Sequence, residues 1–501
     1  MGTERTRGSR VHTGIVWGYC ILIATGCLLI CSKSSFLYPI NDWADTNIFF
    51  TMGKGMANGL VIYRDLYDHK GPLLYAMYAL CYAVAPLSFA GVFALEVLCF
   101  SLFLLSAYKL LRVYDVGHAA WLAVPVLGFA VASSLSFQQG GSAEELCLPM
   151  LSWSLLSLLT YLKNESPKRM KTQTLVWNGV LCGCVLWVKF TMLGLHAPWI
   201  AAAFLCAASQ KQWKEARRRV VLFAAGIALA TVPWIVYFGA HGALHVWFKT
   251  YVYDNLFLYA AGAESPGIIA QGRAILQSGW AWLTGNPGYT ALVLAGMAWF
   301  LRKAAPWEKG AMLLSVGICA LGVFIGGKSY LYYGLILAVF AAPGLIPLCR
   351  WLEARTFFAH AQGKKRMWLC AVLSALCIAL CYPVSPNTQT SFLQPKEETM
   401  QYRIAAAIQE PESATLLNYG FMDAGFYTAA GITPGVKYFH QTNVPLQEML
   451  DEQIRYIEDG ICTYVVTRGK QPDGMEEQYI LIATADSPGF WYEKVYLYRL
   501  P

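Results

Sequence analysis

Long apolar runs separated by short polar connections fill the first three quarters of the chain. About eleven of these runs approach the roughly 20 residues that a helix needs to cross a hydrocarbon core of about 30 Å. This pattern predicts an all-α polytopic membrane domain over residues 1–383, with about eleven transmembrane helices. The expected spans lie near residues 15–31, 87–108, 117–134, 145–162, 175–188, 191–208, 220–238, 288–301, 310–325, 331–349 and 367–382.

The pattern changes in the last quarter of the chain. Residues 384–501 carry 15 of the 30 acidic residues but only 8 of the 38 basic ones, and they contain no run long enough to span a membrane. Short apolar segments and one amphipathic helix predict a small soluble α/β domain. Its expected elements are a helix at 397–409, a strand at 414–418, a helix at 445–457, a strand at 463–467 and a strand at 492–499.

The connection after the first span, residues 32–86, is long and has a pattern of its own. Apolar residues recur at helical spacing over residues 48–56, opposite polar residues that include Lys54. This predicts a helix that lies in the membrane interface with its polar face in water. A second short helix is expected at residues 73–84, where Pro72 is suited to the first turn.

Composition and charge agree with a cell-membrane protein. The chain is 56% hydrophobic and 14% charged, with a mean hydropathy of +0.43, values that soluble domains do not have. With a cytoplasmic N-terminus, the inner connections hold 22 of the 38 Lys and Arg residues. The positive-inside rule therefore predicts that orientation, and an odd number of spans places the C-terminal domain outside. The net charge of +8 is explained by anchoring to the inner leaflet, so nucleic acid is not an expected partner.

The fifteen cysteines do not suggest a disulfide scaffold, because nearly all of them lie within apolar runs. Cys182 and Cys184 have no histidine or second cysteine pair nearby at zinc-binding spacing, so no metal site is predicted.

Five ionisable residues lie between the two expected interfacial helices: Arg64, Asp65, Asp68, His69 and Lys70. In a soluble protein, a solvated turn of mixed charge would explain them. At membrane depth each charge costs roughly 2.5 to 3.5 kcal/mol unless it is paired or used. A binding or catalytic role is therefore favoured. Asp45, just before the first interfacial helix, is explained either as its N-cap or as a catalytic acid.

The order Asp45-Thr46-Asn47, Tyr63-Arg64-Asp65 and Asp68-His69-Lys70-Gly71-Pro72 resembles the first outer loop of a family of bacterial membrane glycosyltransferases. They are related to protein O-mannosyltransferases and lipid A aminoarabinose transferases and have the GT-C fold. In that family an acid at the head of the first interfacial helix is the catalytic base, and a lysine contacts the phosphate of a polyprenyl-phosphate sugar. The matching residues are Asp45 and Lys70. The sequence departs from the family at Thr46, where many relatives have a second acid, and at His69, where the aminoarabinose transferases have Glu.

The resemblance implies inverting transfer of a hexosyl or pentosyl group from a polyprenyl phosphate to an extracytoplasmic glycan, lipid or protein. The phosphate is already a good leaving group, so such an enzyme needs a cation on the phosphate and a base on the acceptor hydroxyl. Lys70 is suited to binding the phosphate, and His69 is a further hydrogen-bond donor to it. Asp45 is suited to accepting the proton of the acceptor hydroxyl. No cofactor is required, although a divalent cation is compatible. Arg64, Asp65 and Asp68 are the expected substrate contacts.

Other outward-facing residues are secondary candidates. Glu144 and Glu145 follow Ser142, where they fit either the first turn of a capped helix or a sugar or metal site. Lys189 is explained by snorkelling or by a second phosphate contact. Lys328, beside two glycines and near several tyrosines, fits either a phosphate site or an aromatic interface belt.

The ring-rich connection at residues 239–287 fits either sugar stacking or a position at the membrane interface.

Two other classes of function remain open at this stage. A transporter or flippase of lipid-linked sugars would show internal duplication or mid-span charges, and the sequence has few such charges and no visible repeat. A non-catalytic cell-envelope assembly protein would use the C-terminal domain for binding and would not need Asp45.

Overall fold

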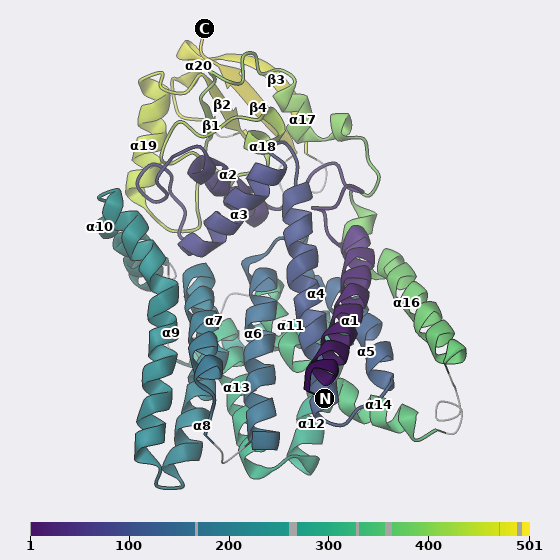
Figure 1. Cartoon of the computed structure of the whole chain (residues 1–501). Coiled ribbons are helices and arrows are strands. Elements are labelled where there is room, and N and C mark those ends of the chain that lie inside the picture. The colour runs from purple at the N-terminus through teal and green to yellow at the C-terminus, as the bar shows by residue number, and fades with distance from the viewer. Residues whose placement is uncertain are drawn as a thin grey trace.

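The computed structural model of this chain has a body of long helices with a small sheet-containing domain on one end (Figure 1). The structure describes residues 2–165, 169–259, 268–326, 330–355, 363–469, 471–487 and 493–501. The helices of the body are α1 (Gly2–Cys31), α4 (Ala90–Val113), α5 (Ala119–Ala132), α6 (Ala143–Thr160), α7 (Thr172–Lys189), α8 (His196–Ala208), α9 (Trp213–Ala240), α11 (Ile268–Gly285), α12 (Pro287–Lys303), α13 (Pro306–Phe324), α14 (Leu345–Glu353) and α16 (Lys364–Val384).

Seven helical stretches among the described residues are long and apolar enough to cross a membrane. An eighth is a pair bent by 51°, formed by the 3-10 helix η5 (Leu331–Phe340) and the segment Ala342–Glu353. The chain is therefore a multi-pass membrane protein, as predicted. The expected number of about eleven spans stays a prediction, because elements such as α5, with 14 residues, are too short for this criterion.

The longest apolar stretch, Thr172–Ala208, doubles back on itself. At the start of α9, Arg218 donates to Thr172 Oγ1 at 2.7 Å and Arg219 donates to Ala203 O at 2.7 Å. Both ends of the stretch thus lie beside the same turn of α9. The chain rises along α7, turns through the 3-10 helix η3 (Phe190–Leu195) and returns along α8, as expected of two neighbouring spans.

Both helices expected in the first outer loop are present, as α2 (Ala44–Ala57) and α3 (Pro72–Val84). The expectation of a water-facing side on α2 is wrong. Every residue from Thr46 to Gly55 is buried, including Lys54, which is 1% exposed. The reason is that the C-terminal domain lies next to α2 (Figure 1) and supplies hydrogen-bond partners to Thr51 and Lys54.

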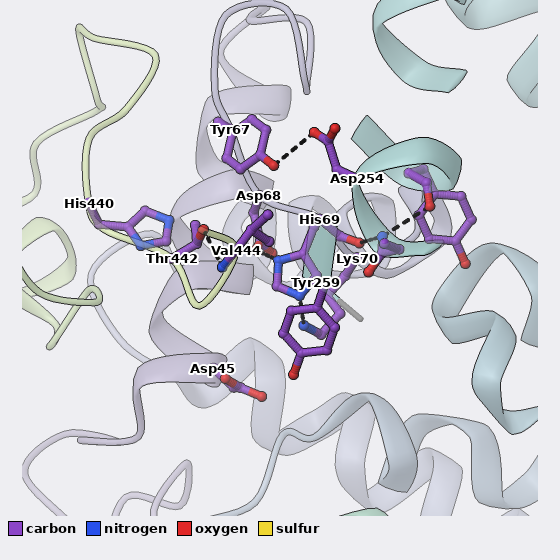
Figure 2. A network of polar contacts seen from close by, with 12 residues as sticks. Asp45, Tyr67, Asp68, His69, Lys70, Asp254, Tyr259, His440, Thr442 and Val444 are labelled. Carbon is purple, nitrogen blue, oxygen red and sulfur yellow. Dashed lines mark hydrogen bonds and ion pairs between the residues drawn. The ribbon is translucent and has the colours of Figure 1, made fainter. Parts of the chain in front are cut away.

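The connection at residues 239–287, expected as a loop, is largely helical where it is described. It contains α10 (Leu244–Trp247), the π-helix η4 (Phe248–Tyr259) and α11. A π-helix of 12 residues is unusual, and such segments occur often at functional sites. Here η4 brings Asp254, Asn255 and Tyr259 against the first outer loop (Figure 2).

The C-terminal domain is α/β, as predicted, and is built around a four-stranded sheet of order β1-β2-β4-β3. Strands β1 and β2 are parallel, and β4 pairs antiparallel with both β2 and β3. Strand β3 was not predicted. The helices and strands of the C-terminal domain are η8 (Lys396–Glu398), α17 (Met400–Ala405), β1 (Leu416–Asn418), α18 (Phe426–Ala430), α19 (Gln447–Glu458), β2 (Tyr464–Thr467), α20 (Met475–Gln478), β3 (Ile480–Asp486) and β4 (Lys494–Arg499).

Candidate active site

Asp45 lies in the first turn of α2, and its carboxylate is not used to cap the helix. The N-cap position belongs to Trp43, which makes no side-chain cap. The Asp45 carboxylate instead accepts a hydrogen bond from the Tyr332 hydroxyl at 3.2 Å. Of the two explanations that the sequence left open, the cap is therefore excluded, and the acid remains available for chemistry.

A tight turn before α6 fixes the start of α2. Thr46 Oγ1 donates to Gly140 O at 2.9 Å, and the Tyr78 hydroxyl donates to Gly141 O at 2.5 Å. Gly140 and Gly141 have φ angles of +86° and +81°, which favour glycine. A Cβ on Gly141 would lie 2.7 Å from the Tyr78 hydroxyl. The glycines thus allow the close approach that orients the first turn of α2, and Asp45 with it.

The segment from Asp68 to Lys70 is held by hydrogen bonds from three sides. Tyr75 donates to Asp68 Oδ2 at 2.6 Å, and Tyr63 donates to Lys70 O at 2.6 Å. From η4, Asn255 Nδ2 donates to His69 O at 2.7 Å (Figure 2). The segment has no regular secondary structure, so these contacts fix its conformation.

Asp68, His69 and Lys70 form a chain of polar contacts. Lys70 Nζ lies 2.9 Å from His69 Nε2. His69 Nδ1 lies 3.2 Å from Asp68 Oδ1, although at an angle outside hydrogen-bonding geometry. A charged lysine can only donate. His69 Nε2 therefore accepts, and the ring proton is assigned to Nδ1, which faces Asp68.

The electrostatics keep this chain in one charge state near neutral pH. Burial, reinforced by the charge of Lys70, lowers the pKa of His69 and leaves the ring neutral. Burial opposes the charge of Asp68, but His69 and the positive charge of Lys70 together outweigh burial and hold the pKa of Asp68 well below its usual range. Burial also opposes the charge of Lys70, but the carboxylates of Asp68 and Asp45 raise the pKa of Lys70. The result is an anion, a neutral imidazole and a cation in a row.

A series of aromatic contacts connects Asp45 to Lys70. The Tyr332 ring, whose hydroxyl reaches Asp45, lies 4.7 Å from the Tyr333 ring. The hydroxyls of Tyr333 and Tyr259 are 3.2 Å apart, and the Tyr259 ring lies 5.1 Å from the ring of His69. Figure 2 shows the Asp45 side chain directed toward the region where Tyr259 and Lys70 end. The two residues that the resemblance singled out are thus linked through four intervening side chains.

A second ion pair lies beside this series. Lys189, at the end of α7, donates to Glu144 Oε1 at 2.5 Å, and its ammonium lies 3.7 Å from the centre of the Tyr333 ring. Ser142 caps α6 by accepting from the Glu145 amide, as predicted. Lys189 and Glu144 are therefore paired with each other next to the Asp45 series.

The remaining predicted residues lie apart from Asp45. Glu145 is buried and accepts from the Gly141 amide at 2.9 Å. Arg64 pairs with Asp65 at 2.7 Å and donates to His241 O at 3.3 Å, on an exposed turn. Lys328 lies outside the described residues.

Sequence reasoning did not identify Tyr332 or Tyr259 as neighbours of Asp45 and His69. The tyrosine-rich segments were visible in the sequence, but an interface belt has the same composition. The part of the chain described by the structure contains no cluster of three or more His, Cys, Asp or Glu residues arranged to hold a metal ion. None of the fifteen cysteines forms a disulfide in the described part of the chain.

No family model matches the chain, and no curated protein sequence matches it significantly. Several solved structures are similar to it. ArnT from Cupriavidus metallidurans bound to undecaprenyl phosphate is 13% identical, covers 96% of this chain over 98% of its own length, and has a TM-score of 0.59. The same protein in the apo state gives a TM-score of 0.58. The archaeal oligosaccharyltransferase AglB from Archaeoglobus fulgidus, in complex with an inhibitory peptide and a dolichol-phosphate, is 12% identical, matches over 92% of this chain and 69% of its own, and has a TM-score of 0.48.

The chain therefore has the GT-C fold that the resemblance in the first outer loop implied, and this expectation is confirmed.

Proposed function

We propose that the protein is an inverting glycosyltransferase that takes a sugar from a polyprenyl phosphate. The acceptor is an extracytoplasmic cell-wall polymer, glycolipid or protein. The shared fold supports this proposal, because the similar ArnT structure holds undecaprenyl phosphate. The distribution of basic residues supports a cytoplasmic N-terminus, about eleven spans and a C-terminal domain outside.

The observation that carries the proposal is the joining of Asp45 and Lys70 by one series of side-chain contacts. The two residues come from different elements, and the charge of Asp45 contributes, after that of Asp68, to the raised pKa of Lys70. A carboxylate beside a cation is the minimum that glycosyl transfer from a phosphate requires.

In the proposed reaction, Asp45 removes the proton from the acceptor hydroxyl as its oxygen attacks the anomeric carbon. The new glycosidic C–O bond forms as the bond from the anomeric carbon to the phosphate oxygen breaks. The polyprenyl phosphate leaves with that electron pair, and the proton passes from Asp45 to water. Because the attack is direct, the anomeric configuration inverts.

Lys70 is the cation that we assign to the donor phosphate. Its neighbour Lys189 is already paired with Glu144 at 2.5 Å, whereas one hydrogen bond to Lys70 Nζ is found among the described residues, with His69. His69 accepts that bond and so orients the ammonium of Lys70. The other two N–H groups of this ammonium are available to phosphate oxygens.

The test is sugar transfer by the purified protein in lipid, after mass spectrometry of copurifying lipids has identified a donor. We expect Asp45→Asn to reduce transfer by about 10²- to 10⁴-fold, and Lys70→Ala to reduce it while weakening donor binding. Asp115→Asn is the matched control, because Asp115 is a surface acid, 77% exposed, that pairs with Lys163.

Full activity in both Asp45→Asn and Lys70→Ala would contradict the mechanism. Movement of lipid-linked sugar across the bilayer without a new glycosidic bond would instead identify a flippase. Envelope assembly that tolerates Asp45→Asn would identify a non-catalytic protein.

A further inference from the structure

Lys54 is a buried lysine whose hydrogen-bond partners come from the far end of the chain. It lies in the last turn of α2 and is 1% exposed. Its ammonium donates to Tyr427 O at 2.9 Å and to Ile432 O at 3.0 Å, both in the C-terminal domain. A cation is not buried in this way without a structural or functional reason.

A second contact lies one turn earlier on the same face of α2. Thr51 Oγ1 donates to Asp423 Oδ2 at 2.6 Å, and both residues are fully buried. Asp423 Oδ1 in turn accepts from the Gly425 amide at 2.9 Å and from Asn418 at 3.2 Å. The carboxylate thus ties α2 to the end of β1 and to the loop before α18.

A third contact reaches the segment that carries Lys70. The Tyr67 amide donates to Lys437 O at 3.0 Å, and the rings of Tyr67 and Tyr438 lie 5.4 Å apart. The nearby His440 of the same domain is 1% exposed and acts electrostatically on Asp68. The C-terminal domain therefore touches both parts of the first outer loop, α2 and the Tyr67–Lys70 segment.

We propose that the C-terminal domain is a clamp on the active-site loop, and that Lys54 is a positioning residue that holds α2, and thereby Asp45, in place. The proposal rests on the proposed function, because the consequence of a displaced α2 is a displaced Asp45. The domain is then part of the catalytic unit and not an independent binding module.

The chemistry of Lys54 fits a structural role. Burial lowers the pKa of Lys54 to about 8, and the charge of Asp423 opposes this only in part. A neutral amine still has two N–H groups, the number needed for the two carbonyls that it contacts. The clamp therefore does not depend on the charge of Lys54, unlike a phosphate site.

The test uses Lys54→Met, which keeps the length of the side chain but cannot donate, and Thr51→Val, which breaks the second contact independently. Hydrogen–deuterium exchange of the full-length protein should show faster exchange at residues 44–57 in both variants. In transfer assays, kcat should fall by about 10- to 100-fold, the effect of a small misplacement of a catalytic group, with little change in the KM for the donor.

A double-mutant cycle separates positioning from general damage to the fold. Because Lys54 acts through Asp45, Lys54→Met should cost less than about twofold in the Asp45→Asn background. The matched control is Lys163→Met. Lys163 also donates to a main-chain carbonyl, Val113 O at 2.6 Å, but at the opposite end of α6 from Glu144.

Unchanged exchange at residues 44–57 in Lys54→Met would overturn the proposal, and so would equal losses of kcat in both backgrounds. If the wild-type protein transfers no sugar, the proposed function fails. The exchange experiment then still decides whether the domain clamps α2.

Discussion

Lys54 and Lys70 lie on the same outer loop and each is near a carboxylate, but Lys54 is fully buried, Lys70 is partly buried, and their hydrogen-bond partners differ. Lys54 donates two hydrogen bonds to main-chain carbonyls of the C-terminal domain, and burial lowers the pKa of Lys54 to about 8. The Lys70 ammonium has one hydrogen bond among the described residues, to His69, and two acids raise the pKa of Lys70. A lysine is therefore available to a ligand when nearby carboxylates stabilise its charge but some of its N–H groups have no hydrogen-bond acceptor in the protein.

Reversing the charge of each lysine should give the largest difference between the two variants in folding and in donor binding. Lys54→Glu would place a second buried carboxylate near Asp423 without a partner, at a cost of about 3 to 5 kcal/mol, so we expect misfolded or aggregated protein. Lys70→Glu should fold, because Lys70 is only partly buried, but it should not bind donor. Size-exclusion profiles in detergent check the first expectation and donor binding checks the second. Well-folded Lys54→Glu protein would contradict the difference that we describe.

Replacing each lysine by methionine should give a smaller difference, which is one of affinity for polyprenyl phosphate. Lys70→Met removes a charge-assisted hydrogen bond of about 1.5 to 3 kcal/mol and should weaken polyprenyl-phosphate binding by about 10- to 150-fold. Lys54→Met should leave the affinity within about twofold. Equilibrium binding to the protein in nanodiscs measures both, and equal losses of affinity would show that the two lysines have the same role.

Acid should destabilise the folded protein through two buried histidines, His69 of the first outer loop and His440 of the C-terminal domain. Burial lowers the pKa of His69 and of His440 below their ordinary value of 6.5. The unfolded chain therefore binds protons below pH 6.5 that the folded protein does not. Stability should fall as the pH drops below that value, by up to about 1.4 kcal/mol per pH unit for each histidine.

The check is the midpoint of thermal unfolding at pH 7.5 and pH 5.5. We expect His440→Gln to lose less stability on acidification than the wild type does. The exposed His241 serves as the control, and His241→Gln should behave like the wild type. An equal loss in wild type and His440→Gln would rule out a contribution from His440.

Tyr332→Phe tests the aromatic side of the contact series. It removes the hydroxyl that lies 3.2 Å from Asp45 Oδ2 while keeping the ring that packs on Tyr333. A hydrogen bond to a charged group contributes about 1.5 to 3 kcal/mol, and this one is long, so kcat should fall by about tenfold. A change confined to the KM for the donor would instead place Tyr332 on the phosphate side.

The smallest effect is expected for Arg64, a third cation of the same loop. Its pairing with Asp65 is on the surface, and exposed ion pairs contribute about 0 to 1 kcal/mol. Arg64→Ala should therefore change the transfer rate by less than about twofold. A tenfold loss would show that the turn moves toward the donor during the reaction.

The local features of the active-site loop could be predicted from the sequence. Helical spacing gave α2, Gly71-Pro72 gave the start of α3, and Ser142 gave the cap of α6. Each of these signals depends only on residues that are neighbours in the sequence and on the position of the membrane. Asp45 and Lys70 were singled out by the resemblance of that short loop to a known family, and their roles stay predictions.

The surroundings of that loop could not be predicted, because they depend on contacts between distant residues. Tyr332 is 287 positions from Asp45, and an amphipathic pattern cannot reveal that the polar face of α2 meets protein instead of water. Strand β3 was missed because most of its residues are exposed, so it lacks the alternation that identifies a half-buried strand.

The partners of Lys54 lie 373 and 378 residues later in the chain, and this has a consequence for biosynthesis. While the polypeptide is still emerging from the ribosome, Lys54 and Thr51 lack their partners in the C-terminal domain, and α2 is held only by its contacts within the membrane body. Under the proposed function, a nascent chain becomes fully competent for sugar transfer only after translation has produced the region that follows the last membrane helix.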